Sequence, residues 1–230
     1  MQARVEVAAL DAAMVVFEAR VDKAINQRVH ALRASVLAEK PTWLRDVVAA
    51  YHTLMIVYDV QTAEYAEVER FLHHHLQKVS AQTAARTGCL HEFKVCYDAD
   101  LGMDLTRVSE LTGLSTSAII EHHSAPTYHV YTIGFAPGFA YLGDVTESLQ
   151  VPRQSTPRTK VPAGSVAIAN QQTAIYPRPS PGGWNLIGRV AGWQFETGLT
   201  MQAGDQVKFI PISRAEYDQL EQQARERTND

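Results

Sequence analysis

The chain has 230 residues, of which 46% are hydrophobic and 20% are charged, and its formal net charge at pH 7 is −4. These values are typical of a globular protein with one large or two small domains, and they lack the basic excess that binding to nucleic acid requires. The longest apolar run near the start, Ala12 to Phe17, is far shorter than the roughly 20 residues that span a bilayer. We therefore expect a cytoplasmic protein that binds neither nucleic acid nor membrane.

The pattern of residues 1–98 predicts an α+β lobe. Arg4 to Phe17 is rich in valine, alanine and methionine, which indicates a strand or a hairpin. Asp22 can cap a helix that ends before Pro41, because its carboxylate accepts the free N–H groups of a first helical turn. Two strands, a second helix and a last strand are predicted over 46–51, 54–58, 62–86 and 90–97. The order strand, helix, two strands, helix and strand is a split-βαβ (ferredoxin-like) pattern.

Residues 99–126 are predicted to form a helical bridge, and residues 127–230 a β-barrel domain. Gly113 separates two short helices of the bridge, and Ser115 can cap the second. From Thr127 the pattern contains only short strands between glycine and proline turns, over 127–133, 166–169, 173–176, 184–190, 194–197 and 206–212. Such strands predict a barrel or a sandwich, in which closure protects the strand edges.

The stretch from Tyr131 to Arg189 holds seven of the ten prolines and seven of the thirteen glycines. Because proline fixes φ and glycine opens positive φ, this stretch predicts strands that are joined by specific turns. Its acidic residues are Asp144 and Glu147, and its basic residues are Arg153, Arg158, Lys160, Arg178 and Arg189. The local positive excess predicts an anionic small molecule as the ligand.

Two turns of this stretch are candidate binding elements. The paired Gly182 and Gly183 between Ser180 and Trp184 can adopt positive φ and direct successive N–H groups at an anion, or can form a plain hairpin turn. The loop over 134–139 contains Pro137 and Gly138, and its rings of Phe135 and Phe139 could line a small pocket or fill the mouth of the barrel.

Several side chains of the same stretch can bind a carboxylate or a phosphate. Arg153 and Arg158 stand five apart in an extended, proline-bounded segment, where they bind an anion or remain solvated. Arg189 lies inside a predicted strand, where a charged side chain needs a partner. Neutral donors are Ser165, Gln172, Tyr176 and Ser180. Residues 73–75 are three histidines in a predicted helix, where successive side chains point about 100° apart. They cannot converge on one metal ion, and no metal site is expected there or elsewhere.

Three segments resemble a known family: GFAPGFAYLG at 134–143, PRQSTPRTKVPAGSVAIA at 152–169 and QTAIYPRPSPGGWNLIGR at 172–189. They are similar to the B component of bacterial 5-oxoprolinase, a family also described as Kip-type kinase inhibitors or allophanate hydrolase subunit 1. The resemblance implies a cyclophilin-like barrel and ATP-dependent hydrolysis of 5-oxo-L-proline (pyroglutamate) to L-glutamate. It also implies A and C subunits as partners. The sequence has no G-x-x-x-x-G-K-[ST] phosphate loop, so ATP is expected to bind together with the partner subunits.

The resemblance also selects the candidate site residues. His123 aligns with a histidine of the family pattern and is a candidate for proton transfer or orientation, although a structural histidine at a helix end is an equal alternative. Asn170 replaces the usual glycine of one turn and can keep its left-handed conformation. The predicted catalytic residues are His123 and Arg189. The predicted substrate-binding residues are Phe135, Pro137, Gly138, Phe139, Arg153, Arg158, Gln172, Tyr176, Ser180, Gly182, Gly183 and Trp184.

Two other functions compete with a role as part of this enzyme. A regulatory protein that inhibits a sensor histidine kinase is implied by the family's second name. A prolyl isomerase is suggested only by the cyclophilin-like barrel, and a fold alone does not establish a function.

Overall fold

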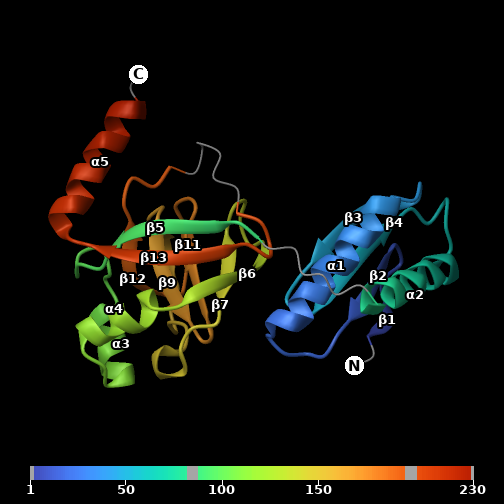
Figure 1. Ribbon diagram of the computed structural model, residues 1–230, viewed down its shortest axis with the longest axis horizontal. Helices are drawn as coiled ribbons and strands as arrows, with labels where there is room; N and C mark the ends of the chain where they lie inside the picture. Colours follow the sequence, from blue (N-terminus) through green and yellow to red (C-terminus); the bar gives the residue numbers. More distant parts are fainter. Residues whose placement is uncertain (1–2, 82–87, 195–200, 229–230) are drawn as a thin grey trace. The chain divides into compact units, whose positions relative to one another are not determined.

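The computed structural model describes residues 3–81, 88–194 and 201–228. Contacts divide the chain into two units, Met1–Thr87 and Gly88–Asp230 (Figure 1). Within the described ranges, no helix is both long enough and apolar enough to cross a membrane.

The N-terminal unit is a four-stranded antiparallel sheet with two helices. Its elements are β1 (Arg4–Ala9), β2 (Ala12–Val16), α1 (Lys23–Glu39), β3 (Leu44–Ala49), β4 (Thr53–Tyr58) and α2 (Tyr65–Ala81), and the strand order is β1-β2-β4-β3. Both β2 and β3 are antiparallel to β4, which lies between them. They therefore run in the same direction on either side of β4, so β2, α1 and β3 form the predicted split βαβ unit. The predicted cap of α1 is confirmed, because Asp22 accepts a 2.9 Å hydrogen bond from the N–H of Ile25.

The last predicted strand of the N-terminal lobe belongs to the other unit. β5 (Leu90–Cys96) pairs with β12 (Asn185–Val190) and runs parallel to β13 (Gln206–Ile212) along its whole length. In the N-terminal sheet, the place beside β2 is taken by β1, which a tight turn joins to β2. The prediction that residues 90–97 complete the N-terminal sheet is therefore wrong, and the boundary of the units lies before β5.

Seven strands of the C-terminal unit form a closed barrel in the order β10-β7-β6-β13-β5-β12-β9. The remaining bounds are β6 (Thr127–Ile133), β7 (Ala140–Gly143), β9 (Ser165–Ala169) and β10 (Gln172–Ile175), while β8 (Arg158–Val161) and β11 (Ser180–Gly182) pair only with each other. The α+β class and the barrel are confirmed. The predicted strand over 194–197 falls largely outside the described residues.

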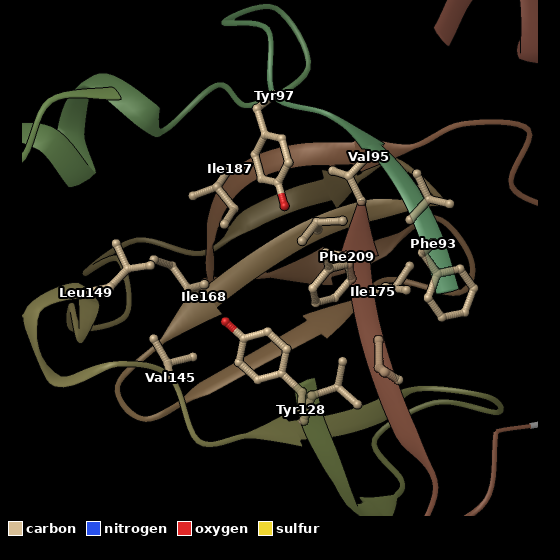
Figure 2. Close-up of a cluster of buried hydrophobic side chains, with 14 of the residues drawn as sticks. Phe93, Val95, Tyr97, Tyr128, Val145, Leu149, Ile168, Ile175, Ile187 and Phe209 are labelled. Carbon is tan, nitrogen blue, oxygen red and sulfur yellow. The ribbon is translucent and has the colours of Figure 1, made fainter. Parts of the chain in front are cut away.

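The barrel interior is filled by alternate side chains of its strands. Tyr128, Phe209 and Ile168 are fully buried there, and Figure 2 shows the rings of Tyr97, Tyr128 and Phe209 among aliphatic side chains. Because successive side chains of a strand point to opposite faces, the residues between these positions lie on the outer face of the barrel. This alternation decides which of the predicted binding residues lie inside the barrel and which lie on its outer face.

Two predicted helices are confirmed, but they are part of the barrel unit and not a separate bridge. α3 (Leu105–Thr112) and α4 (Thr116–Ser124) contribute Leu105, Val108 and Ile119 to the core of the barrel. Gly113 ends α3 with a φ of 72°, and the hydroxyl of Ser115 accepts a 3.2 Å hydrogen bond from the N–H of Ala118. A short 3-10 helix covers Glu147–Leu149.

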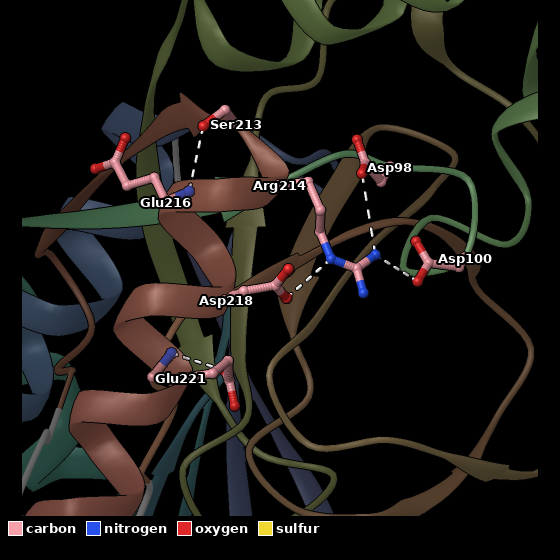
Figure 3. A network of polar contacts seen from close by, with 8 residues as sticks. Asp98, Asp100, Ser213, Arg214, Glu216, Asp218 and Glu221 are labelled. Carbon is pink, nitrogen blue, oxygen red and sulfur yellow. Dashed lines mark hydrogen bonds and ion pairs between the residues drawn. The ribbon is translucent and has the colours of Figure 1, made fainter.

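The C-terminal helix α5 (Arg214–Thr228) is joined to the loop after β5 by its first residue. Arg214 donates hydrogen bonds to Asp100 at 2.5 Å and to Asp218 at 2.9 Å, and it lies 4.0 Å from Asp98 (Figure 3). These groups are exposed, so the pairs contribute little to stability. They orient the start of α5 with respect to the end of β5.

Candidate functional site

A two-stranded ribbon of β8 and β11 carries several predicted binding residues. Arg158 is opposite Gly182 and Val161 is opposite Ser180, so the register shifts by one residue between these pairs. A bulge of this kind turns Arg158 and Val161 to the same side of the ribbon. Val161 is fully buried in a cluster with Tyr176 and Trp184, so this side of the ribbon faces the outer surface of the barrel.

Four predicted aromatic residues meet on this outer surface. Phe139 lies edge to face with Phe135, Tyr176 and Trp184, at centroid distances of 5.2, 5.4 and 5.8 Å. The sequence did not single out Tyr141, whose ring is 4.9 Å from that of Phe139. Small residues lie between the rings, namely Ala167, Ala169 and Ala174. The rings of Phe139, Tyr176 and Trp184 are at most 5% exposed, so the cluster is a small hydrophobic core between the outer face of the barrel and the ribbon.

The loop over 134–139 places one of these rings in solvent. Phe135 is 65% exposed and has a φ of 67°, and Gly138 has a φ of 79°. Pro137 lies between them in the turn, which closes with a 3.0 Å hydrogen bond from the N–H of Gly134 to the carbonyl of Phe139. The loop thus holds Phe135 at the edge of the aromatic surface. Asn170 has a φ of 51°, which confirms that asparagine keeps the left-handed turn there.

The predicted anion nest at the paired glycines is wrong. Neither Gly182 nor Gly183 has a φ in the left-handed region. A Cβ atom on Gly182 would overlap the hydroxyl oxygen of Tyr176, whereas one on Gly183 would lie 3.5 Å from the nearest atom of Pro157. Glycine is required at 182 because the ribbon passes close to the Tyr176 ring, and the positive φ that the sequence suggested is not used.

The two glycines therefore provide a matched pair of variants. Gly182→Ala is expected to lower the free energy of unfolding by about 1–3 kcal/mol, because the ribbon or Tyr176 must move. Gly183→Ala is expected to stay within about 0.5 kcal/mol of the wild type, since its Cβ makes only ordinary contacts. Urea unfolding followed by near-UV circular dichroism measures both effects. Equal effects of the two variants would contradict the close-approach explanation.

Beside the ribbon, Arg158 forms a buried ion pair that sequence reasoning missed. Its Nη2 donates a 2.6 Å hydrogen bond to Asp104, which is 5% exposed. The other carboxylate oxygen of Asp104 accepts a 2.7 Å hydrogen bond from the N–H of Leu186. Asp104 thereby fixes the orientation of the guanidinium. Asp104 stands directly before α3, far from Arg158 in the sequence, and no local pattern links the two.

Three buried polar atoms near the ribbon have no hydrogen-bond partner: Arg158 Nη1, Ser180 Oγ and Gln154 Nε2. Gln154 is a second residue that sequence reasoning missed, although it lies in the proline-bounded segment between the two predicted arginines. Its backbone N–H donates a 2.7 Å hydrogen bond to the carbonyl of Gly183. Buried polar atoms without partners are uncommon in native proteins and call for an explanation.

The charges of two arginines act on the pKa of the same tyrosine. Burial raises the pKa of Tyr176, while the backbone N–H of Trp184 and the charges of Arg153 and Arg158 act in the opposite direction. The guanidinium of Arg153 lies 5.8 Å from the centroid of the Trp184 ring. Gln172 is on β10 two residues before Ala174, so strand alternation places it on the same outer face. The ribbon, the rings and both arginines are therefore neighbours on one side of the barrel.

His123 is outside this site, within the core of the barrel. It is 0% exposed, its Nδ1 is 2.8 Å from the hydroxyl of Tyr97, and its Nε2 is 2.9 Å from the hydroxyl of Thr173. Burial lowers the pKa of His123 to about 3. A neutral, enclosed imidazole with both nitrogens bonded fits the structural alternative and not the predicted role in proton transfer.

Arg189 is also separate from the ribbon. Arg189 pairs with Cys96 of β5. It follows Trp184 by five residues, a separation of about 16 Å along an extended strand. Its charge opposes the rise in the pKa of Tyr217, which burial and Glu221 cause. Arg189 thus lies toward α5, and the structure does not bring it together with the predicted binding residues. Among the residues that the structure describes, no group of His, Cys, Asp and Glu could hold a metal ion.

The sequence matches the family described as the carboxyltransferase domain, subdomain C and D, over residues 3–200. It is 32% identical over 222 residues to the B component of 5-oxoprolinase from Bacillus subtilis, a match that covers 90% of this chain and 92% of the relative. It is 49% identical over 123 residues to the B component of 5-oxoprolinase from Haemophilus influenzae, a match that covers 52% of this chain and 58% of the relative.

Solved structures share the fold. The crystal structure of TTHA0988 is 35% identical with a TM-score of 0.73, and the match covers 88% of this chain but only 40% of that longer chain. Urea carboxylase of Kluyveromyces lactis is 15% identical with a TM-score of 0.75, over 94% of this chain and 22% of that chain, which shows the fold alone. The chain therefore belongs to the carboxyltransferase subdomain C and D family and is a relative of the proteins named as the B component of 5-oxoprolinase.

Proposed function

We propose that this chain is the B component of an ATP-dependent 5-oxoprolinase. The complex hydrolyses 5-oxo-L-proline (pyroglutamate) to L-glutamate and cleaves ATP to ADP and phosphate. The observation that carries the proposal is the match to the Bacillus subtilis B component over 90% of this chain. The outer face of the barrel supports it, because a small flat lactam suits a place where an exposed ring, that of Phe135, adjoins an aromatic cluster.

The residues of this chain bind and orient the lactam in this proposal. The ring of Phe135, which is 65% exposed, contacts the face of the lactam and excludes water from it. Hydrolysis breaks the bond between the ring nitrogen and the carbonyl carbon, and water supplies the hydroxyl and the proton. The sequence has no G-x-x-x-x-G-K-[ST] phosphate loop that could hold a triphosphate. We therefore assign ATP to parts that the A and C subunits complete, in the cytoplasm where ATP is abundant.

Reconstitution tests the function. The purified chain alone is expected neither to hydrolyse ATP nor to open 5-oxo-L-proline, because it lacks a phosphate loop. Addition of the A and C subunits is expected to give release of L-glutamate with matched release of phosphate. The control is the mixture of A and C without this chain, which should be inactive. Steady turnover by the isolated chain, or full activity of A and C without it, would contradict the proposal.

A further inference from the structure

The ribbon of β8 and β11 is anchored to the barrel unit at the starts of its two segments. These segments cover residues 152–163 and 177–183, and six of the ten prolines of the chain lie in them. The carbonyls of Pro152 and Pro177 each accept a 2.9 Å hydrogen bond from a side chain of the barrel unit. Because proline fixes φ and removes a backbone donor, each segment is stiff and offers few N–H groups for pairing. The ribbon can therefore move as one piece.

Beyond its anchors, the ribbon lies over the aromatic cluster. Among the described strands, β8 and β11 pair only with each other and not with a strand of the barrel. Gly182 lies against the ring of Tyr176, where a Cβ atom would overlap the hydroxyl oxygen. Val161 is fully buried in the same cluster, and Tyr176 and Trp184 are 2% and 5% exposed. The ribbon thus covers rings that would be exposed without it.

A buried ion pair joins the middle of the ribbon to the barrel unit. Nη2 of Arg158 donates a 2.6 Å hydrogen bond to one carboxylate oxygen of Asp104. The other oxygen accepts a 2.7 Å hydrogen bond from the N–H of Leu186 on β12, so the barrel unit itself holds the carboxylate in place. A charge-assisted hydrogen bond is stronger than a neutral one. This pair is placed to hold the ribbon closed.

Three unpartnered polar atoms oppose closure of the ribbon. Arg158 Nη1, Gln154 Nε2 and Ser180 Oγ are buried without a hydrogen-bond partner. The first two belong to the segment that contains β8, and the third belongs to β11. Burial of a polar atom without a partner costs free energy, and water would bond all three atoms if the ribbon moved away from the barrel. The closed position is therefore a balance between the ion pair and the buried rings on one side and these atoms on the other.

We propose that the ribbon opens as one unit while the barrel stays folded, and that the ion pair of Arg158 with Asp104 is its latch. Local openings of this kind require less free energy than global unfolding. Opening uncovers Tyr176 and Trp184 close to Phe135, which is already exposed, and so enlarges the apolar surface on this side of the barrel. The inference concerns this chain by itself and does not rest on the proposed function.

Thiol labelling of the full-length Val161→Cys chain tests the opening. Iodoacetamide is the probe, and mass spectrometry of peptides measures the rate at each cysteine, divided by its rate in the unfolded chain. Cys96 is the internal control, because it is 0% exposed on a strand of the barrel. We expect the introduced thiol to react at least about a hundredfold faster than Cys96. Its rate should also rise less steeply with guanidinium, since opening exposes less surface than unfolding.

Variants in the same background test the latch and the unpartnered atoms. Arg158→Gln is expected to speed labelling at position 161 by about ten- to a hundredfold, because a charge-assisted hydrogen bond is lost from the closed state. Lys160→Gln is the control, since Lys160 is exposed on the same strand, and it should keep the rate. Ser180→Ala removes a buried hydroxyl without a partner and is expected to slow labelling about three- to tenfold. Loss of a merely structural contact would not slow it.

The outcomes decide the proposal. Equal normalised rates at position 161 and Cys96, or an equal dependence on guanidinium, would show that the ribbon opens only when the barrel unfolds. An unchanged rate in Arg158→Gln, or faster labelling in Ser180→Ala, would also overturn the inference. Near-UV circular dichroism checks the fold of each variant. If Val161→Cys does not fold, Ala167→Cys replaces it, because Ala167 is 0% exposed in the same cluster. If Arg158→Gln does not fold, Ser180→Ala decides the result.

Discussion

A fragment from Gly88 to Asp230 is expected to fold by itself, and a fragment that begins at Ala99 is expected not to fold. The two differ by β5 and the residues that flank it. β5 lies between β12 and β13 in the closed barrel, and it pairs with β13 in parallel from Leu90 to Cys96. Without β5, the facing edges of β12 and β13 are open.

The side chains of this segment are a large part of the core. Phe93, Val95, Cys96 and Tyr97 are each at most 7% exposed. Burial of a large apolar side chain contributes about 1.5–3 kcal/mol, and the net stability of a domain is only about 5–15 kcal/mol. Loss of these four side chains removes stabilisation comparable to the whole net stability of a domain. Tyr97 also bonds His123, so its loss leaves a buried imidazole nitrogen without a partner.

Guanidinium unfolding of both fragments, followed by near-UV circular dichroism, measures the difference. The Gly88 fragment should show a cooperative transition, and the Ala99 fragment should show none. A synthetic peptide of residues 88–98 is expected to restore the near-UV signal of the Ala99 fragment, because it supplies the missing strand. Cooperative unfolding of the Ala99 fragment at the same midpoint as the longer one would show that β5 is dispensable.

The long distance in sequence between β5 and its partner strands explains why its place in the barrel was not predicted. Its strand pattern was recognised, but a parallel partner gives no turn signal between the two strands. One of the bonds that holds the start of β5 joins the N–H of Cys89 to Asp205, 116 residues away. By contrast, the cap of α1 depends on Asp22 and Ile25, three residues apart, and such local chemistry was predicted correctly.

The candidate site shows the same limit. The density of glycine, proline and arginine singled out a stretch in which the rings of Phe139, Tyr176 and Trp184 do meet. The role of Gly182 was misread, because a glycine in a sequence shows only that a Cβ is disfavoured. It does not show whether conformation or space is the reason. The strands β7, β8 and β11 have only four, four and three residues, too few for an alternating pattern to be visible.

The burial of His123 is expected to make the stability of the chain strongly dependent on pH. The hydroxyl of Thr173 donates to the carbonyl of Ala167 at 3.0 Å, so it must accept from Nε2 of His123. Nδ1 therefore carries no proton and accepts from the hydroxyl of Tyr97. The ring also stacks on Phe209 at a centroid distance of 4.7 Å. Protonation of Nδ1 would place a second donor against the Tyr97 hydroxyl within an apolar core.

The sign of the effect follows from the two pKa values. Burial lowers the pKa of His123 to about 3 in the folded chain, from an ordinary value of 6.5. Between these values the unfolded chain binds a proton that the folded chain does not bind. Folding is therefore favoured least at low pH, and the stabilisation that is complete above pH 6.5 is lost as the pH falls toward 3. The slope is up to about 1.4 kcal/mol per pH unit, or about 2 kcal/mol between pH 6.5 and 5.

His123→Gln isolates this contribution, because an amide can still bond the hydroxyls of Tyr97 and Thr173 but does not titrate. Urea unfolding at pH 6.5 and pH 5 should show that the variant loses about 2 kcal/mol less than the wild type over this interval. His122→Gln is the control, since His122 is the next residue of α4 and bonds Ser148 in an exposed position. It should keep the wild-type dependence. NMR of histidine-labelled chain should show no titration of His123 above pH 4, and a midpoint near 6.5 would overturn the assignment of His123 as a buried neutral residue.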